Sequence, residues 1–363
     1  MKKILLLDSN FSSLPIYNYL IQLDYTVYTI GMNKLDILCE LNKDFHLHED
    51  YSNLSTLKNI IDKYNIDLFL PGCNDLSYEM CVKLNDYYNV IQIESLKNTQ
   101  IINTKNLFRQ FTNSNDIPSP KLIEVGEINS FDRVIIKPCE SYSGKGVTII
   151  EKSRYLSSLE ESIEYAKKNS RDNNFLIEEF VEGELFSYSC FIKNKKVIES
   201  FVVKEKCLLN QFRVDTSYFD YKFPENIKTE IKSEIEKISH LIDLKDGLLH
   251  LQLILDKNFD FYFIELTRRC PGDLYSLLIK KSTNYEYVKN YVNCLIGLNF
   301  EEVEIINRFV LRRSIFKKNE LLKFSNFNEV FWSFNSFNAK DKNQRIAIEF
   351  EEFEDIESIE KRI

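Results

Sequence analysis

Short apolar runs alternate with amphipathic segments over the first ninety residues of the chain. In order, the alternating strand-like and helix-like segments are residues 4–7, 16–23, 26–30, 57–64 and 67–72. Strands that alternate with helices are typical of a parallel sheet. The loop after the first run lacks the glycines that let a dinucleotide pyrophosphate approach the backbone. Residues 1–100 are therefore predicted to form an α/β domain that is Rossmann-like in topology but not in cofactor.

The pattern changes near residue 100. A helix is predicted after the cap candidates Asn103 and Thr104, with its inward side formed by Leu107, Phe108 and Phe111. Strand-like runs follow, with a glycine-containing loop between the second and the third, at residues 121–125, 133–138, 146–151 and 175–180. This α+β pattern predicts a small antiparallel lobe over residues 101–182.

The next region combines a long amphipathic helix with a hairpin. Isoleucines recur at helical spacing over residues 225–243, with charges on the other face. The strand-like runs 248–255 and 259–266 flank a turn and predict a β-hairpin. We assign residues 183–300 to a second lobe. Residues 301–363 are acidic and rich in aromatic residues, and we expect them to be a C-terminal extension.

The composition of the chain narrows the class of molecule that it is expected to bind. A chain of 363 residues with 44% hydrophobic content can build two or three cores, and its net charge of -8 argues against a nucleic-acid partner. No run approaches the roughly 20 apolar residues of a membrane span. The eight cysteines form no CxxC pair, which argues against a zinc ribbon or a disulfide framework and favours a cytoplasmic protein. Small molecules are the expected partners.

Polar residues follow the strand that ends at Pro71 and Gly72. Asn74 and Asp75 stand where open α/β sheets place ligand-contacting residues, so both are substrate candidates. An equally good alternative is an Asx turn that caps a helix from Leu76. His46 and His48 share one side of a short strand-like run, but no third metal ligand stands near them.

The glycine loop at residues 139–146 fits neither of two familiar phosphate motifs. A P-loop would need glycine at position 139 and Ser or Thr at position 146, where this chain has Cys139 and Gly146. A dinucleotide fingerprint that starts at Gly144 would need glycine at position 149, where this chain has Ile149. What remains is a strand that ends in Lys137, a flexible loop and a return strand. This pattern suits a lid whose backbone N–H groups close over phosphates, although an ordinary hairpin loop remains the alternative.

Four segments in a fixed order carry a family resemblance. They are NTKNLFRQF before IPSP, IIKPCESYSGKGV, FLIEEFVEGE and FYFIELTRRCPGD. In this order they resemble the ATP-grasp superfamily, specifically its carboxylate–amine ligase-like branch, with the fold of biotin carboxylase and the carbamoyl-phosphate synthase large subunit. The resemblance covers residues 1–300. It implies a Rossmann-like pre-ATP-grasp domain followed by a two-lobed ATP-grasp domain.

The resemblance implies an ATP site between the lobes. Lys105 and Lys137 would reach the phosphates from two sides. The ribose carboxylate of the family falls at Leu185, and Glu184 would replace it only after a shift of strand register. The remaining residues that the resemblance assigns to ATP are those of the loop and the hinge: Ser141, Ser143, Gly144, Gly146, Glu178, Glu179, Phe180 and Val181.

The resemblance also implies a metal and an acceptor site. Glu265 would bind Mg²⁺, or Mn²⁺ in its place, together with Gln252 and Thr267, where the family has Glu and Asn. Arg269 would act with Lys137 in catalysis, either on the phosphoryl group or on the acceptor carboxylate. His250 lies on the same side of its strand as Gln252. The expected substrate residues are Arg269, Gly272, Asp273, Asn74, Asp75 and Arg213.

The implied reaction is that of an ATP-dependent ligase. A substrate carboxylate attacks the γ-phosphate to form an acylphosphate, and an amine then displaces phosphate, so the protein needs no nucleophile of its own. The partners would be a small carboxylate and a small amine, without nucleic acid or membrane, and a homodimer is compatible with the family. Leu185, Gln252 and Thr267 leave two alternatives open, a nucleotide-binding module without turnover and an ATP-grasp kinase.

Overall fold

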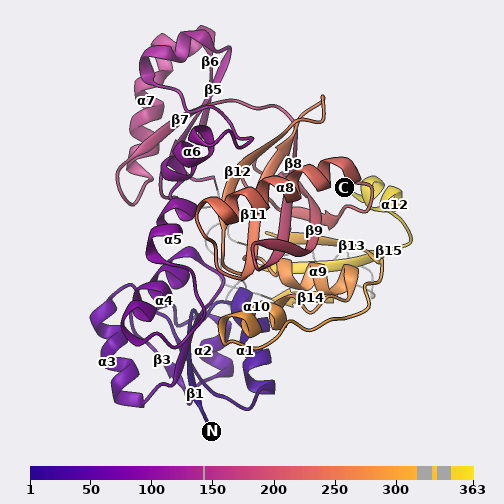
Figure 1. The fold of residues 1–363 in the computed structure, drawn as a ribbon. Coiled ribbons are helices and arrows are strands. Elements are labelled where there is room, and N and C mark those ends of the chain that lie inside the picture. The colour runs from indigo at the N-terminus through magenta and orange to yellow at the C-terminus, as the bar shows by residue number, and fades with distance from the viewer. Residues whose placement is uncertain (142–143, 317–328, 333–344) are drawn as a thin grey trace.

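The computed structural model describes residues 1–141, 144–316, 329–332 and 345–363 (Figure 1). Its N-terminal part is a parallel sheet with strand order β3-β2-β1-β4, and this confirms the predicted alternation of strands and helices. The strands are β1 (Lys3–Leu7), β2 (Thr26–Ile30), β3 (His46–Leu47) and β4 (Leu68–Pro71). The helices are α1 (Leu14–Gln22), α2 (Ile37–Leu41), α3 (Leu54–Tyr64) and α4 (Asp75–Tyr88).

A small lobe stands apart from the rest of the molecule (Figure 1). Its antiparallel sheet has the order β6-β5-β7 and packs with α7 around a core of its own. The elements of the lobe and of the segment that leads to it are α5 (Leu96–Asn103), α6 (Lys105–Ser114), β5 (Arg133–Pro138), β6 (Thr148–Glu151), α7 (Tyr155–Lys168) and β7 (Phe175–Glu179).

Two predictions about this lobe are wrong. Residues 121–125 do not form a strand, because only Leu122 bridges to Glu178 and the chain then turns into a 3-10 helix at Val125–Ser130. Leu107 does not face inward, since 38% of it is exposed, whereas Phe108 is buried as expected.

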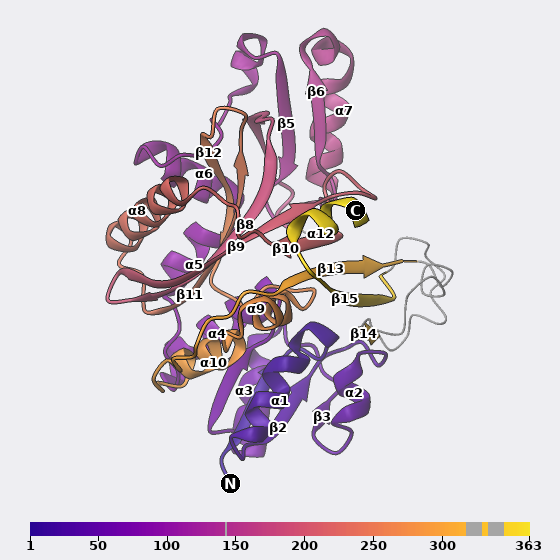
Figure 2. The ribbon, with the colours of Figure 1, turned by 90° about the vertical axis from the view of Figure 1, so that its right-hand side faces the viewer.

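The largest element is an antiparallel sheet with the order β12-β11-β8-β9-β10-β13-β15-β14 (Figure 2). Its strands are β8 (Glu184–Lys193), β9 (Lys196–Lys206), β10 (Thr216–Phe219), β11 (Gly247–Leu255), β12 (Phe261–Thr267), β13 (Phe309–Ile315), β14 (Glu329–Trp332) and β15 (Ala347–Phe353). The predicted hairpin is confirmed as β11 and β12. The sequence predicts only an extension after residue 300, whereas β13 and β15 pair within this same sheet.

The two faces of this sheet carry different kinds of side chain. Side chains alternate between faces along a strand, so cross-strand partners such as Ser187, Gln252 and Glu265 share one face. The other face is apolar and packs against α8 (Glu225–Leu241), the helix that the isoleucine pattern predicts. The residues expected to bind metal therefore lie on the face opposite to α8.

Two helices join the large sheet to the N-terminal sheet. They are α9 (Tyr275–Thr283) and α10 (Tyr287–Leu295), and one apolar core includes residues of both sheets and of both helices. Tyr19 of α1 donates a hydrogen bond to Asn293 of α10. The last helix, α12 (Ile356–Arg362), packs against β13 and β15. No helix in the described part of the chain is long and apolar enough to cross a membrane.

Candidate functional site

Three segments predicted to share a site meet at Lys105, the first residue of α6. Its Nζ donates to the Ser141 carbonyl at 3.0 Å and lies 4.0 Å from the nearer carboxylate oxygen of Glu265. Lys105 thus connects the glycine loop of the small lobe to the end of β12 in the large sheet. Ser143, expected in the same loop, lies outside the described residues.

The glycines of this loop are required by its backbone. Gly144 and Gly146 have φ angles of +68° and +83°, in the left-handed region that favours glycine. A Cβ at Gly144 would lie 2.2 Å from the Cβ of Phe212, and one at Gly146 would lie 2.6 Å from Pro138. Glycine at 144 therefore lets the loop approach the large lobe at Phe212, and glycine at 146 lets it pack against Pro138 of β5.

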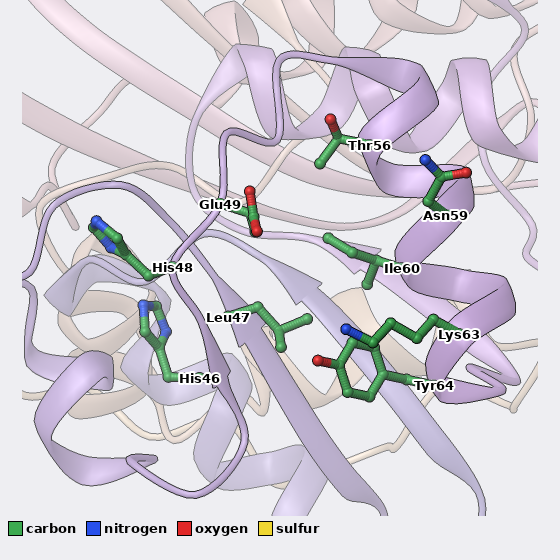
Figure 3. Close-up of a pocket in the computed structure, with 9 residues that line it drawn as sticks. All are labelled: His46, Leu47, His48, Glu49, Thr56, Asn59, Ile60, Lys63 and Tyr64. Carbon is green, nitrogen blue, oxygen red and sulfur yellow. The ribbon is translucent and has the colours of Figure 1, made fainter.

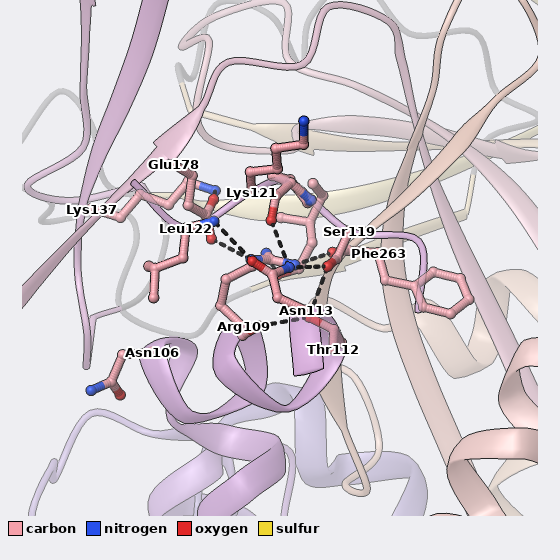
Figure 4. Close-up of polar contacts among 12 residues, drawn as sticks. Asn106, Arg109, Thr112, Asn113, Ser119, Lys121, Leu122, Lys137, Glu178 and Phe263 are labelled. Carbon is pink, nitrogen blue, oxygen red and sulfur yellow. Dashed lines mark hydrogen bonds and ion pairs between the residues drawn. The ribbon is translucent and has the colours of Figure 1, made fainter. Parts of the chain in front are cut away.

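A buried ion-pair cluster links the small lobe to the large sheet (Figure 4). The Glu178 carboxylate accepts from Lys137 Nζ and from Arg109 Nε, each at 2.6 Å. The Arg109 guanidinium also donates to the carbonyl oxygens of Phe263 and Ile264 on β12. Burial alone would raise the pKa of Glu178, but the cations Arg109 and Lys137 outweigh it and lower that pKa to about 2. Glu178 is therefore a fixed negative charge that holds Lys137 in place.

The contacts in this cluster correct the expected role of the Glu178 side chain and add Arg109 to the site. The Glu178 carboxylate is 1% exposed and fully engaged, so it does not line an adenine pocket. Arg109 was missed in the sequence because it stands in the apolar pattern of α6. Its spacing from Lys105 could have identified it, because Lys105 and Arg109 lie four residues apart on one helix face.

The rest of the hinge between β7 and β8 is tied to the small lobe. The Glu179 carboxylate accepts from the Lys121 backbone N–H at 2.9 Å. Phe180 donates its N–H to the Arg133 carbonyl, and its ring lies 4.5 Å from the Arg133 guanidinium carbon. Val181 follows, half-buried, before β8 begins. The side chain of Glu179 is thus occupied, and the hinge offers backbone groups at Phe180 and Val181.

The residues expected to bind metal lie together on one face of the large sheet. Gln252 of β11 is the cross-strand partner of Glu265 on β12. The Gln252 amide N–H donates to Glu205 at 2.6 Å, which leaves its carbonyl oxygen as a ligand, and the Glu265 side chain is 49% exposed. One carboxylate and one amide oxygen fit a magnesium ion that keeps several waters.

The Thr267 hydroxyl forms hydrogen bonds within the protein in place of the expected metal contact. Its hydroxyl donates to Asp75 at 3.4 Å and accepts from the Arg269 backbone N–H at 3.3 Å. A Thr hydroxyl is also a weaker ligand for Mg²⁺ than the Asn carbonyl of the family pattern. The geometry therefore gives Thr267 a role in shaping the turn before Arg269.

Glu184 does not face the expected nucleotide. The register in which it would replace Leu185 requires a shift of β8, yet Leu185 pairs in regular order with Glu205 and with Ile254. Glu184 consequently points to the opposite face from Gln252 and forms ion pairs with Lys204 and Lys206. Its assignment to ribose binding is wrong, because a strand reverses its side chains with every residue.

Arg269 is joined to the N-terminal sheet by an ion pair. Its Nε lies 2.8 Å from the Asp75 carboxylate, at the start of α4. Burial opposes ionisation of Asp75, but the Arg269 charge outweighs it and lowers the pKa of that carboxyl. Asn74 is the N-cap of α4, as its side chain accepts from the Ser77 N–H. The capping alternative is therefore correct for Asn74, with the helix starting at Asp75 instead of Leu76.

The other expected substrate residues lie on the loop after Arg269 or face it. The Asp273 carboxylate is 2.6 Å from Arg312, and Gly272 lies beside Cys73. The Arg213 guanidinium carbon lies 4.2 Å from the ring centre of Phe316. Arg213 also contributes to the positive field around Arg345, a neighbour of Asp273. Arg312 and Arg345 were missed because the sequence after residue 300 carries no motif.

The remaining histidines are accounted for by packing. His250 is buried against Tyr275, and burial together with Arg269 lowers its pKa to about 3, so the ring is neutral. His46 contacts Thr29 and Cys39. His46 and His48 line an open pocket of about 470 Å³ between β3 and α3 (Figure 3). No group of three metal-binding side chains occurs there or elsewhere among the described residues.

Comparisons with known proteins agree with this arrangement. A family model described as the ATP-grasp domain matches residues 131–276. The phosphoribosylamine–glycine ligase of Pyrococcus furiosus is 25% identical over 209 residues, which are 54% of this chain and 47% of that protein. The tyramine–L-glutamate ligase of Methanocaldococcus fervens is 32% identical over 130 residues, which are 35% of this chain and 41% of that protein. The chain thus spans less than half the length of both curated relatives.

A solved structure extends the likeness to the whole fold. The N5-carboxyaminoimidazole synthetase from Staphylococcus aureus, complexed with ADP, superposes with a TM-score of 0.80 and 13% identity over 99% of this chain and 95% of that one. At this identity the likeness concerns the fold alone. Residues 131–276 thus match an ATP-grasp domain, and the whole chain shares the fold of this solved synthetase.

Proposed function

We propose that this protein is an ATP-dependent ligase that activates a small carboxylate as an acylphosphate and couples it to an amine, with release of ADP and phosphate. The observation that carries the proposal is the meeting of Lys105, the glycine loop and Glu265 between the two lobes. The names of both curated relatives, a phosphoribosylamine–glycine ligase and a tyramine–L-glutamate ligase, support a ligase reaction. The eight free thiols support a reducing compartment such as the cytoplasm.

In this proposal ATP lies between the lobes. Lys105 and Lys137 bind its phosphates from two sides, because Glu178 keeps the Lys137 ammonium in place. The described residues of the glycine loop, Ser141, Gly144 and Gly146, contact the phosphates through backbone N–H groups. The backbone at Glu179, Phe180 and Val181 contacts the adenine.

Glu265 and the Gln252 carbonyl oxygen hold the metal, Mg²⁺ or Mn²⁺. When bound, the ion neutralises charge on the phosphate oxygens. Arg269 stabilises the phosphoryl group or the acceptor carboxylate with its planar guanidinium, and Asp75 orients it through the 2.8 Å contact. Asp75 occupies the Nε–Nη2 edge of Arg269, so an incoming carboxylate binds the other edge, where Nη1 donates to the Cys270 carbonyl at 3.4 Å.

Gln252 and Thr267 support a second candidate, a nucleotide-binding module without turnover. The family pattern has a carboxylate at the first position, so this site carries about one negative charge less and binds metal more weakly. A kinase that stops after phosphoryl transfer would share every residue named above.

One assay separates the three. ADP release is measured with ATP, Mg²⁺ and a panel of carboxylates, with and without amines, and hydroxylamine is added to trap an acylphosphate as hydroxamate. A ligase yields hydroxamate and amine-dependent product. A kinase yields ADP and a stable phosphorylated acceptor, and a module binds ATP without ADP release for any acceptor.

Matched variants test the residues. We expect Glu265→Ala and Lys137→Ala each to lower turnover by about a hundredfold or more, because the first removes a carboxylate ligand of the metal and the second removes a cation from the phosphates. Glu164→Ala and Lys167→Ala remove the same charges from the surface of α7 and should leave turnover unchanged. Normal activity of Glu265→Ala would overturn the assignment of the metal site.

A further inference from the structure

A cluster of charges lies beyond Arg269, on the side of the large sheet that faces the N-terminal sheet. The Asp273 carboxylate is 2.6 Å from Arg312 on β13 and 4.0 Å from Arg345 just before β15. Arg312 is 1% exposed and also donates to Ser217 and to the Asp273 carbonyl, whereas Arg345 is 27% exposed. Two guanidinium groups, one on β13 and one just before β15, thus converge on one carboxylate.

The backbone around this cluster is held in an uncommon conformation. Asp273 and Leu274 both have φ angles in the left-handed region, +54° and +59°. Non-glycine residues are rare there, and such residues concentrate at functional sites. The Asp273 N–H donates to the Ser12 hydroxyl, and Arg345 lies 4.7 Å from the ring centre of Phe11. The loop after β1 therefore contacts this cluster from the N-terminal sheet.

The charges of the cluster are incompletely balanced. Burial, together with the positive fields of Arg312 and Arg213, lowers the pKa of Arg345 to about 10, although Asp273 opposes this. Glu205 lies on the same face, and its carboxyl is near Asp273 and Arg312. Three guanidinium groups, those of Arg213, Arg312 and Arg345, thus lie near two carboxyls.

We propose that Arg345 and Arg312 bind the carboxylate of the amine-bearing substrate while Asp273 faces its ammonium group, so that the amine substrate of this enzyme is an amino acid or a close amino-carboxylate. The inference rests on the proposed ligase function. An amino acid carries both charges within a few ångströms, which matches a pocket where both signs lie within 4.0 Å. Arginine suits the carboxylate because its planar edge binds two oxygens at once.

The cluster suits the amine better than the carboxylate that is activated. The activated carboxylate must lie beside Glu265 and Arg269, where the γ-phosphate is bound in the proposed mechanism. Asp273 and Glu205 would repel an anion that has no ammonium group, but they attract the ammonium group of a zwitterion. The two substrates therefore occupy neighbouring places on the same face of the sheet.

The test measures binding directly and needs no turnover. The twenty L-α-amino acids are titrated by calorimetry into the full-length protein with ADP and Mg²⁺. Each is compared with its α-amide, which lacks the carboxylate, and with its N-acetyl derivative, which lacks the ammonium. We expect at least one amino acid to bind at least tenfold more tightly than both derivatives. We expect Arg345→Ala to weaken it tenfold or more, and Arg345→Lys to weaken it less.

The controls separate the pocket from the fold and from the proposed reaction. Arg345 is changed instead of Arg312 because it is partly exposed, and ADP binding reports whether the variant is folded. Arg154→Ala removes an exposed arginine from the small lobe and should change nothing. If no amino acid binds, or if Arg345→Ala binds it unchanged, the inference is overturned. If binding depends on Arg345 but no acceptor yields ADP, the pocket stands and the ligase function fails.

Discussion

The pKa values of two buried glutamates in this protein are shifted in opposite directions. Glu178, at the end of the small lobe, and Glu205, in the large sheet, are both hidden from solvent. The pKa of Glu178 is lowered to about 2, whereas the pKa of Glu205 is raised to about 7. Burial acts on both in the same sense, so it does not decide the outcome.

The difference lies in the partners. Glu178 contacts two cations at 2.6 Å, and their attraction exceeds the loss of hydration. Glu205 contacts the neutral amide of Gln252 and is repelled by the negative charge of Asp273. The positive charge of Arg312 offsets burial and this repulsion only in part. The small lobe therefore keeps a permanent charge that positions Lys137, and the large sheet keeps a carboxyl that can change its charge near neutral pH.

The largest effect is expected from breaking the cation cluster. Arg109→Met leaves the Glu178 charge half-compensated and two β12 carbonyls without their donor, so the free energy of unfolding should fall by about 3–5 kcal/mol at pH 7. Urea unfolding measures the loss. The matched control is Arg133→Met, which removes an exposed ion pair with Glu182 and should lower stability by less than about 1 kcal/mol.

The same cluster predicts acid sensitivity. The folded pKa of Glu178 lies below its ordinary value of 4.5, so the stability it contributes is present above about pH 4.5 and is lost as the pH falls towards 2. Arg109→Met should therefore differ less from the wild type at pH 3 than at pH 7. Equal losses at both pH values would contradict the cluster as the origin of the effect.

Glu205→Gln should have the opposite pH dependence. The folded pKa of Glu205 lies above its ordinary value of 4.5, so its contribution is full below pH 4.5 and is lost as the pH rises through 7. The variant has no proton to lose and should match the wild type near pH 4, while exceeding its stability by up to about 3 kcal/mol at pH 8. Glu182→Gln, on the surface, should show no such trend.

A smaller effect is expected from Gln252→Glu. A second carboxylate beside Glu265 should strengthen Mg²⁺ binding several-fold, by about 1 kcal/mol, because it restores one negative charge to the site. The new side chain would meet Glu205, so the double variant Gln252→Glu with Glu205→Gln should keep the stronger Mg²⁺ binding without the repulsion. The Mg²⁺ dependence of nucleotide binding provides the measurement, and no change in the double variant would remove Gln252 from the metal site.

The smallest effect is expected at Glu184. Its ion pairs with Lys204 and Lys206 are on the surface, so Glu184→Ala should lower stability by less than about 1 kcal/mol. ATP affinity should be unchanged, because the side chain faces away from Gln252. A large loss of ATP affinity would restore the ribose role that the strand register excludes.

Local patterns predicted much of the fold. The alternation over residues 1–100, the isoleucine helix and the β11–β12 hairpin follow from side-chain periodicity, and the structure contains all three. The predictions that failed depend on distant partners. Residues 121–125 have a strand-like sequence but end in a 3-10 turn, and after residue 300 β13 acquires its place only by pairing with β10, and β15 by pairing with β13.

The sequence by itself determined the order of four motifs, because a motif is a local property, and the resemblance of these motifs to the ATP-grasp superfamily implied the candidates Lys105, Lys137 and Glu265. Only the tertiary structure decided that Glu178 holds Lys137, that Glu184 points away, and that Arg312 and Arg345 meet Asp273. These outcomes depend on strand register and on contacts between residues far apart in the chain, and a linear pattern contains neither.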